Sequence, residues 1–303
     1  MNDLATFEAH RTHLIGIAYR MLGEMSAAED VAQEAWLRWQ RAEGEEIRDP
    51  RAWLSAVAVR LSLDALRKAR TRRETYVGPW LPEPILPDDV RALAADAPAA
   101  RAELASDLSL ALLHVLERLS PEERAALILH DAFDCDYAVI AQALEKSEAA
   151  CRKLVSRARE RVKTDRPRHT VDRGQHQDLL QRFAAASASA DTSALMRLFA
   201  PDVVLYSDGG GKAKAALNPI YGADKVARFL AGVVSKFWQN NFEVRLVELN
   251  GMPGFVLQED GSLHSALTVE FDGEAVSALY FVRNPDKLER INRLFSPGPS
   301  PSA

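Results

Sequence analysis

The chain has 303 residues, a formal net charge of −5, and 47% hydrophobic and 27% charged residues. This length predicts two or three globular domains, and the acidic balance excludes a chain that coats nucleic acid by bulk charge. No apolar run is long enough to span a bilayer, no apolar stretch opens the chain as an export signal, and two cysteines provide neither a disulfide framework nor a metal site. We therefore expect a cytoplasmic protein with no membrane partner, metal or cofactor.

Residues 1–75 have a helical pattern throughout. Asp49 and Pro50 predict an N-cap and a first helical turn. The helix that follows has one apolar stripe, made of Leu54, Val57, Ala58, Leu61 and Ala65. A second stripe carries an aromatic ring and charges, and suits unstacked bases and a single-strand backbone. Its members are Trp53, Arg60, Asp64, Arg67 and Lys68. The alternative is that the tryptophan packs against a neighbouring helix and the arginines are solvated.

Residues 76–102 read as a linker, because six of them are proline or glycine, which break helices. The linker contains one apolar segment, WLPEPIL, from Trp80 to Leu86. An exposed tryptophan with three aliphatic side chains is unusual in a free linker, so we expect this segment to dock on another part of the protein.

Residues 103–165 are helical again. Ser120, Pro121 and Glu123 predict a capping box that opens one helix. Two further helices, joined by a turn around Leu144–Ser147, predict a helix-turn-helix unit. The second of them has an apolar stripe of Cys151, Leu154, Val155, Ala158 and Val162, whereas Arg152, Lys153, Ser156 and Arg157 lie off this stripe. This division suits a helix in the major groove, but it also suits a solvated basic face on an ordinary helical hairpin.

Residues 174–295 have a different pattern of apolar residues, with strand-like as well as helical runs. Helical patterns at Leu179–Ala186 and Leu195–Phe199 precede runs typical of strands, at 203–207, 242–249, 254–258, 264–271 and 275–282. Glycine-rich turns separate these runs. Helices followed by a curved antiparallel sheet predict an α+β domain.

Three segments of the first half follow one another in the order Glu29–Trp39, Asp49–Arg70 and Leu119–Val162. In sequence and in order, they resemble the extracytoplasmic-function (ECF) family of sigma factors, which direct bacterial RNA polymerase to promoters. The resemblance implies two all-α domains, sigma region 2 at 1–75 and sigma region 4 at 103–165. It also implies that Asp30, Gln33 and Glu34 face the clamp of the polymerase's largest subunit, and that Pro121–Phe133 faces the flap of the second-largest. Promoter DNA would be contacted at the minus-ten element by Trp53, Arg60, Asp64 and Arg67, with the Glu45–Arg48 loop near a flipped base, and at the minus-thirty-five element by Arg152, Lys153, Ser156 and Arg157.

The third region, 174–295, resembles the SnoaL-like, cone-shaped α+β barrels of the NTF2 superfamily. A subgroup of these sigma factors carries such a fused domain together with three short motifs, and all three are present here. They are WLPEP (Trp80, Leu81, Pro82, Glu83, Pro84), DGGGK (Asp208, Gly209, Gly210, Gly211, Lys212) and NPDKL (Asn284, Pro285, Asp286, Lys287, Leu288). Some relatives have arginine at the position of Lys212. Without the resemblance, DGGGK would be a flexible hairpin turn and NPDKL a strand exit that caps a helix.

The resemblance implies a promoter-specificity factor, not an enzyme, that the third region regulates in cis. We expect the WLPEP segment to latch onto the DGGGK turn, with Lys212 meeting Glu83, and the latched form to be less active; the barrel could also support activity. The alternative is that the third region is a small-molecule receptor or residual enzyme, with Tyr206, Asp208, His264 and Glu270 as candidate pocket residues. Its further partner would then be a small ligand or a regulatory protein. A simple helix-turn-helix repressor leaves Glu29–Trp39 and Asp49–Arg70 without a role.

Overall fold

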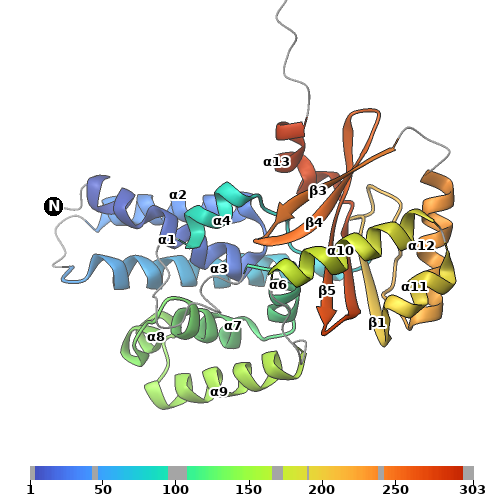
Figure 1. Cartoon of the computed structure of the whole chain (residues 1–303). Coiled ribbons are helices and arrows are strands. Elements are labelled where there is room, and N and C mark those ends of the chain that lie inside the picture. Colours follow the sequence, from blue (N-terminus) through green and yellow to red (C-terminus); the bar gives the residue numbers. More distant parts are fainter. Residues whose placement is uncertain are drawn as a thin grey trace, which may run out of the picture. The chain divides into compact units, whose positions relative to one another are not determined.

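The computed structural model describes residues 4–42, 47–94, 108–165, 173–189, 191–237 and 242–295. The chain divides into two compact units (Figure 1). Met1–Thr75 and Asp88–Arg166 make up the first unit, and Tyr76–Pro87 and Pro167–Ala303 make up the second. The segment that we expected to dock therefore belongs to the same unit as the third region of the sequence.

The first part of the helical unit contains α1 (Leu4–Leu22), α2 (Met25–Arg41) and α3 (Pro50–Glu74). Helix α1 packs against both of the others. The predicted start of α3 is confirmed, because the Asp49 carboxylate accepts a hydrogen bond from the Ala52 N–H at 3.0 Å. Its predicted stripe is buried at Leu54, Val57 and Ala58 and half-buried at Leu61 and Ala65. The helix also buries Ser55, Ala56 and Val59, so it is covered on more than one side.

The second part contains α6 (Leu110–Leu116), α7 (Pro121–Leu127), a π-helical turn η2 (Ile128–Ala132), α8 (Tyr137–Leu144) and α9 (Glu148–Asp165). The capping box is confirmed. Ser120 Oγ accepts from the Glu123 N–H at 3.3 Å, and Glu123 Oε2 accepts from the Ser120 N–H at 3.0 Å. Between α8 and α9, Glu145 adopts a left-handed conformation with φ of 55°, which reverses the chain and completes the helix-turn-helix.

Part of the expected linker is helical, which corrects the prediction that prolines exclude helices there. Helix α4 spans Pro87–Ala94. Proline is tolerated in the first helical turn because its missing N–H has no intrahelical acceptor there. Asp88 and Asp89 follow in the same turn and complement the positive end of the helix. The remaining linker residues, 95–102, lie outside the described residues.

A six-stranded sheet forms the centre of the second unit, in the order β2-β1-β6-β5-β4-β3. The strands are β1 (Phe199–Asp208), β2 (Ile220–Tyr221), β3 (Phe242–Leu249), β4 (Met252–Glu259), β5 (Ser262–Asp272) and β6 (Ala275–Val282). The expected strands are all present, but the sheet is not purely antiparallel. Strands β1 and β6 pair in parallel, with Leu205 opposite Leu279. This pairing is possible because a long connection separates the two strands in sequence.

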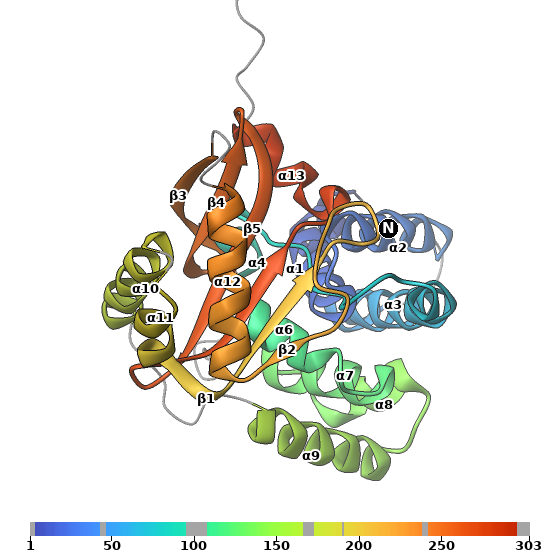
Figure 2. The same ribbon diagram turned by 90° about the vertical axis from the view of Figure 1, so that its right-hand side faces the viewer.

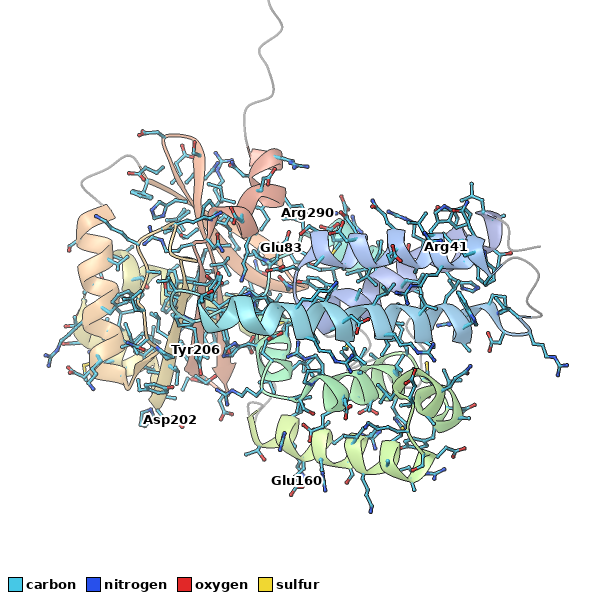
Figure 3. The ribbon with its side chains drawn as sticks, turned by 180° about the vertical axis from the view of Figure 1, so that it is seen from behind. Arg41, Glu83, Glu160, Asp202, Tyr206 and Arg290 are labelled. Carbon is cyan, nitrogen blue, oxygen red and sulfur yellow. The ribbon has the colours of Figure 1, made fainter. Side chains whose placement is uncertain are left out.

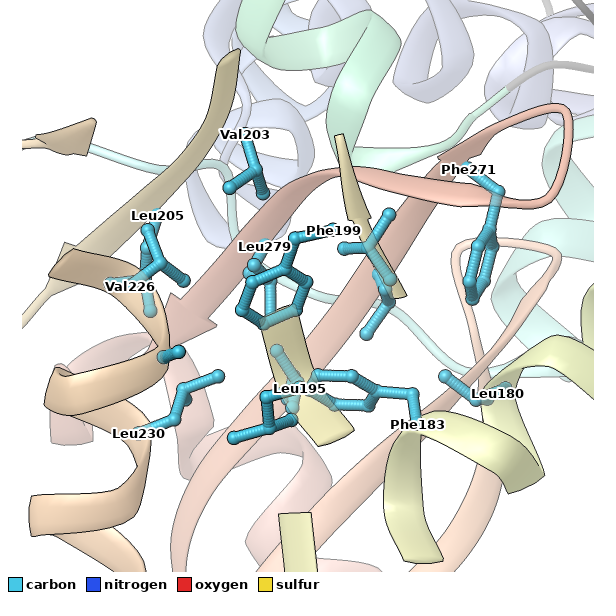
Figure 4. Packing of buried hydrophobic residues seen from close by; sticks show 14 of the residues in the cluster. Leu180, Phe183, Leu195, Phe199, Val203, Leu205, Val226, Leu230, Phe271 and Leu279 are labelled. Atoms are coloured by element: carbon cyan, nitrogen blue, oxygen red, sulfur yellow. The ribbon is translucent and has the colours of Figure 1, made fainter. Parts of the chain in front are cut away.

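Three helices, α10 (Arg173–Ala188), α11 (Thr192–Leu198) and α12 (Ala223–Phe237), cover one face of this sheet. Figure 2 shows α12 running in front of the strands. Leucine and phenylalanine side chains fill the space between these helices and the sheet, as Figure 4 shows. The helices contribute Leu180, Phe183, Leu195 and Leu230, and the strands contribute Phe199, Phe271 and Leu279. The interior of this α+β unit is therefore a packed apolar core.

Two helices of this unit were not among the predicted elements. Helix α12 follows the short strand β2, and α13 (Pro285–Phe295) follows β6. The NPDKL motif begins α13: Asn284 Oδ1 accepts a hydrogen bond from the Asp286 N–H at 3.2 Å, and Pro285 occupies the first helical position. NPDKL is thus, in its local structure, a strand exit that caps a helix.

Candidate nucleic-acid interface and regulatory contact

Helix α9, the second helix of the helix-turn-helix, has the two faces that the sequence predicted. Cys151, Val155, Ala158 and Val162 are buried, and Leu154 is half-buried. The four predicted DNA-contacting side chains are all exposed, namely Arg152, Lys153, Ser156 and Arg157. The helix can therefore pack through one face while its polar face remains available to a ligand.

The basic side chains of α9 differ in their partners. Arg152 lies 2.8 Å from Glu148, and its guanidinium is 4.8 Å from the centre of the Tyr137 ring. Among the described residues, neither Lys153 nor Arg157 forms an ion pair. These two cations are thus free to bind phosphate or base edges, whereas Arg152 is held in one orientation.

Two further arginines of α9 have structural partners. Arg161 donates to Glu123 at 2.7 Å, and Arg159 Nε donates to Asp131 at 2.9 Å. Burial raises the pKa of Asp131, but hydrogen bonds from Arg159 and His130 outweigh burial and hold this pKa below its ordinary value. Arg159 therefore keeps a partly buried carboxylate charged, and its role is to join α9 to η2.

The residues predicted to contact the minus-ten element do not share one environment. Trp53 is half-buried and packs edge-on against the buried Trp39, with ring centres 5.6 Å apart. Asp64 and Arg67 are exposed and pair with each other at 3.0 Å. Arg60 is engaged within the helical unit: Nη2 donates to the Gln142 carbonyl at 2.8 Å and Nε to the Ala143 carbonyl at 3.4 Å.

The acceptors of Arg60 lie at the C-terminal end of α8, where carbonyls without intrahelical partners carry partial negative charge. Glu145 adds a carboxylate 4.0 Å from the same guanidinium. The predicted DNA-contacting face of α3 and the helix-turn-helix are thus directly bonded. Of the Glu45–Arg48 loop, Glu45 and Glu46 lie outside the described residues.

The predicted polymerase-binding residues lie on α2. Asp30 and Gln33 are exposed, and Glu34 is half-buried and 3.5 Å from Arg38. Gln33 also lines a groove of about 380 Å³ between α1 and α2, with Phe7, Trp36 and Leu37. The segment Pro121–Phe133 is largely buried, and at its end the Phe133 ring contacts the His13 ring, with centres 4.7 Å apart.

In the second unit, Asp208 at the end of β1 brings together the three short motifs. This side chain is fully buried. Its Oδ1 accepts from the Tyr76 hydroxyl at 2.5 Å, and its Oδ2 accepts from the Leu81 N–H at 2.9 Å and from Lys287 Nζ at 2.7 Å. One carboxylate of the DGGGK motif therefore binds the docked segment and the NPDKL motif at once.

Lys287 is the cation of this cluster, with a side chain only 5% exposed. Besides Asp208, its Nζ donates to the Leu81 carbonyl at 2.5 Å and lies 3.9 Å from the centre of the Trp80 ring. The Tyr76 ring centre is 5.3 Å away. An aromatic face attracts a cation, and the attraction is strongest where water is excluded. We call this set, Tyr76, Trp80, Leu81, Asp208 and Lys287, the latch cluster.

The glycines of the DGGGK turn allow a close approach. Gly210 has φ of +59°, and a Cβ there would overlap the Asn284 amide and approach the Tyr76 hydroxyl. Asn284 Nδ2 donates to that hydroxyl at 2.9 Å. Lys212, which we expected to meet Glu83, instead pairs with the exposed Asp286 at 2.5 Å. The cation that reaches the docked segment is Lys287, because its side chain points inward from α13 while Lys212 lies on the exposed part of the turn.

The rest of the WLPEPIL segment is held by apolar burial and by two hydrogen bonds between Ile85 and Asn250. Leu81 and Ile85 are fully buried, and Glu83, labelled in Figure 3, is 7% exposed. Ile85 N–H donates to Asn250 Oδ1 at 3.0 Å, and the Asn250 N–H donates to the Ile85 carbonyl at 2.8 Å. The prediction that this segment docks on the third region is confirmed. The sequence did not predict the roles of Tyr76 and Asn250 in docking. For Asn250 the one available signal was Asn250-Gly251, a typical hairpin turn between two predicted strands.

None of the four candidate pocket residues belongs to the apolar core beneath the helices. Tyr206 alternates along β1 with the core residue Leu205, and Glu270 alternates along β5 with Val269, so both lie on the opposite face. His264 lies where the register of β4 and β5 shifts; its ring centre is 5.0 Å from that of Phe242, and its Nε2 is 2.7 Å from Arg283 Nη2. Tyr206, labelled in Figure 3, stacks on Tyr280 with ring centres 5.5 Å apart. Burial and the neighbouring Arg283 lower the pKa of His264. Within the described residues, no group of three or more metal-ligating side chains occurs.

Comparison with known proteins identifies the class to which these features belong. Residues 6–72 match the Sigma-70 region 2 family, and residues 109–162 match the Sigma-70, region 4 family. No described helix has the length and hydropathy to cross a membrane. The α3 face and the helix-turn-helix are thus parts of a sigma factor, a protein that directs RNA polymerase to promoters.

Full-length relatives make the assignment more specific. The chain is 41% identical to the ECF RNA polymerase sigma factor SigJ of Mycobacterium tuberculosis (strain ATCC 25618 / H37Rv), over 94% of this chain and 93% of that protein. It is 30% identical to the probable ECF RNA polymerase sigma factor SigI of the same strain, over 95% of both chains. The crystal structure of M. tuberculosis SigJ superposes with a TM-score of 0.74 at 37% identity, over 95% of this chain and 98% of that one. This chain belongs to the ECF RNA polymerase sigma factors, and core RNA polymerase and promoter DNA are its partners.

Proposed function

We propose that the second unit of this sigma factor controls promoter-directed transcription in cis, by holding the segment Tyr76–Pro87 through the latch cluster. The observation that carries the proposal is the buried Lys287–Asp208 pair, whose remaining hydrogen bonds come from Tyr76 and Leu81. A buried ion pair is tolerated only when its other donors and acceptors are satisfied. The docked segment satisfies them here, so docking and the stability of the pair depend on each other.

Docking shortens the connection between the two DNA-binding parts of the chain. Region 2 ends with α3 at Glu74, and region 4 begins at Leu110. Residues 76 to 87 lie between them and belong to the second unit. Twelve extended residues span about 40 Å, so the latch removes that much reach from the connection. Region 2 and region 4 must separate to contact two promoter elements, and we infer that the latched form is therefore the less active one.

Contacts within the helical unit favour the same direction of control. Arg60, a candidate minus-ten contact, donates to two carbonyls of α8. Arg124 of α7 donates to the Met21 carbonyl of α1 at 2.6 Å. Promoter DNA would have to replace the first contact before Arg60 could bind it. A shortened connection keeps regions 2 and 4 close to each other. It thereby favours these contacts between them over contacts with DNA.

The roles of the remaining site residues follow from their exposure. We assign Arg157, Lys153 and Ser156 to the minus-thirty-five element, with Arg152 oriented by Glu148, and the α3 face with Trp53, Arg60, Asp64 and Arg67 to the minus-ten element. Asp30, Gln33 and Glu34 would face the clamp, and Pro121–Phe133 the flap. We assign no catalytic role to the second unit, because apolar side chains fill the space between its helices and its sheet and none of the candidate pocket residues belongs to this core.

The test is promoter-directed transcription in vitro with core polymerase, comparing Trp80→Ala and Lys287→Met with the full-length chain. Both variants should raise transcription, since each weakens docking. Lys212→Met is the matched control. It removes the lysine of the DGGGK motif, whose ion-pair partner, Asp286, is exposed. A surface pair contributes only about 0–1 kcal/mol, so this variant should behave as the parent. Equal activity of all four proteins would rule out control through the latch.

A further inference from the structure

The two edges of the sheet differ in how they are protected. One edge is β2, which has only two residues, Ile220 and Tyr221. The other is β3, which has eight residues and pairs with β4 in an unbroken register from Phe242 to Leu249. Natural sheets protect long edges with proline, a bulge, lysine or a covering element, because unpaired backbone groups bind other strands. Strand β3 contains no proline or lysine, and its register shows no bulge.

The middle of β3 is also exposed. Glu243, Val244, Arg245 and Leu246 are exposed in succession, with Val244 56% and Leu246 45% exposed. Val244 is opposite Leu257 and Leu246 is opposite Phe255 in the register, and both of these β4 residues pack in the core beneath the helices. The apolar face of the sheet therefore continues one strand beyond the residues that the helices cover.

The sequence of β3 is complementary to itself in one antiparallel register. If Val244 is opposite Val244 of a second copy, Glu243 is opposite Arg245 and Phe242 is opposite Leu246. This register places opposite charges across both symmetric positions and apolar side chains on the other face. Moving it by two residues would place Arg245 opposite Arg245, which is unfavourable. The charged residues of β3 therefore favour pairing with a second β3 in this register, and they do not prevent strand pairing as edge charges usually do.

We propose that a second copy of this chain pairs with β3 edge to edge, in antiparallel orientation about a two-fold axis through Val244, joining the two six-stranded sheets into one. The inference concerns a surface that the proposed regulation does not use, so either can fail alone. One strand pair buries far less than the roughly 1,200–2,000 Å² of a stable interface. The protein should therefore show a concentration-dependent equilibrium between monomer and dimer, not a permanent dimer.

Sedimentation equilibrium of the full-length chain tests the proposal at concentrations up to about 100 µM, well above a micromolar dissociation constant. Val244→Lys places two lysines opposite each other and should leave only monomer. Tyr221→Lys changes an equally exposed residue on the other edge strand and should dimerise as the parent does. Circular dichroism checks that both variants are folded. A parent chain that is monomeric throughout, or a dimer that Val244→Lys does not weaken, would overturn the proposal.

A charge exchange tests the register itself. Glu243→Arg and Arg245→Glu each place like charges across the symmetric positions, so each variant alone should dissociate about tenfold more readily. In an equimolar mixture of the two variants, the two arginines of one copy meet the two glutamates of the other, and a heterodimer should form. Such a heterodimer would also show that neither substitution acts by unfolding the strand, because mixing cannot rescue a folding defect. A mixture that stays monomeric would exclude this register.

Discussion

The structure distinguishes arginines of α9 by their ion-pair partners, although the sequence pattern treats them alike. On α9, Arg157 is exposed without an ion-pair partner among the described residues, whereas Arg159, also exposed, holds the carboxylate of Asp131. Two residues apart on one helix, they therefore have different expected roles. The first is available to DNA, and the second connects α9 with the π-helical turn.

We expect Arg157→Ala to relax base preference in the upstream promoter element by about 1–3 kcal/mol, the discrimination that a bidentate guanine contact provides. Arg159→Ala should leave base preference intact but lower the thermal stability of the helical unit, because Asp131 loses its main partner. Transcription from promoters substituted base by base, together with melting curves, measures both effects. A uniform loss across all bases in Arg157→Ala would indicate a phosphate contact instead.

His13 gives a residue-scale prediction on pH. Burial and then the neighbouring Arg51 lower its pKa to about 3, from 6.5 in an unfolded chain. Between these two values the unfolded chain binds a proton that the folded chain does not, so stability falls as the pH falls below about 6.5. The loss from this residue between pH 7 and pH 5 should be about 2 kcal/mol. Urea unfolding should show a smaller pH dependence in His13→Gln, and an unchanged dependence would contradict the buried neutral state.

At the scale of elements, the DGGGK turn determines how closely other segments approach Asp208. Gly210 combines a positive φ with a position where an added Cβ would overlap Asn284 and approach the Tyr76 hydroxyl. Gly261, in the turn between β4 and β5, has a similar φ of +78° but no neighbour within 4 Å of an added Cβ. Comparing the same substitution at Gly210 and at Gly261 therefore separates the effect of backbone strain from the effect of lost docking.

Gly210→Ala should release the segment 76–87 and make it susceptible to limited proteolysis. Gly261→Ala should carry a similar conformational cost, about 1–2 kcal/mol, without exposing that segment. Mapping the cleavage sites by mass spectrometry distinguishes the two. Equal protection of the segment in both variants would mean that the contact with Asn284 adapts and that the turn does not control docking.

At the scale of the whole molecule, the proposed latch predicts that substituting Trp80 and removing the second unit have the same cause, the loss of the latch cluster. The second unit contributes Asp208 and Lys287, and the connection between the DNA-binding parts contributes Trp80. Truncation after Arg166 removes the second unit apart from residues 76–87. Once the partners of Trp80 are gone, substituting Trp80 should have no further effect.

We therefore expect Trp80→Ala to raise transcription in the full-length chain and to change nothing in the truncated chain. The four activities form a double-mutant cycle, and a nonzero coupling measures the latch. Core-polymerase binding by each protein serves as the control for folding of region 2. Additive effects of the two changes would show that Trp80 acts elsewhere.

The sequence alone determined the helical first half and the α+β region that follows it, the capping box, the helix-turn-helix and most strands, because these depend on local periodicity and on capping and turn residues. It also identified WLPEPIL as a docking segment, since proline excludes regular structure while its apolar side chains require burial. Only the tertiary structure showed that Lys287, not Lys212, meets the docked segment. That choice depends on how α13 leaves β6 and turns one lysine inward, a geometry set by packing against β5 and not by neighbouring residues. The same reason applies to Arg60: its bond to α8 joins residues 82 positions apart, and no local pattern encodes such a contact.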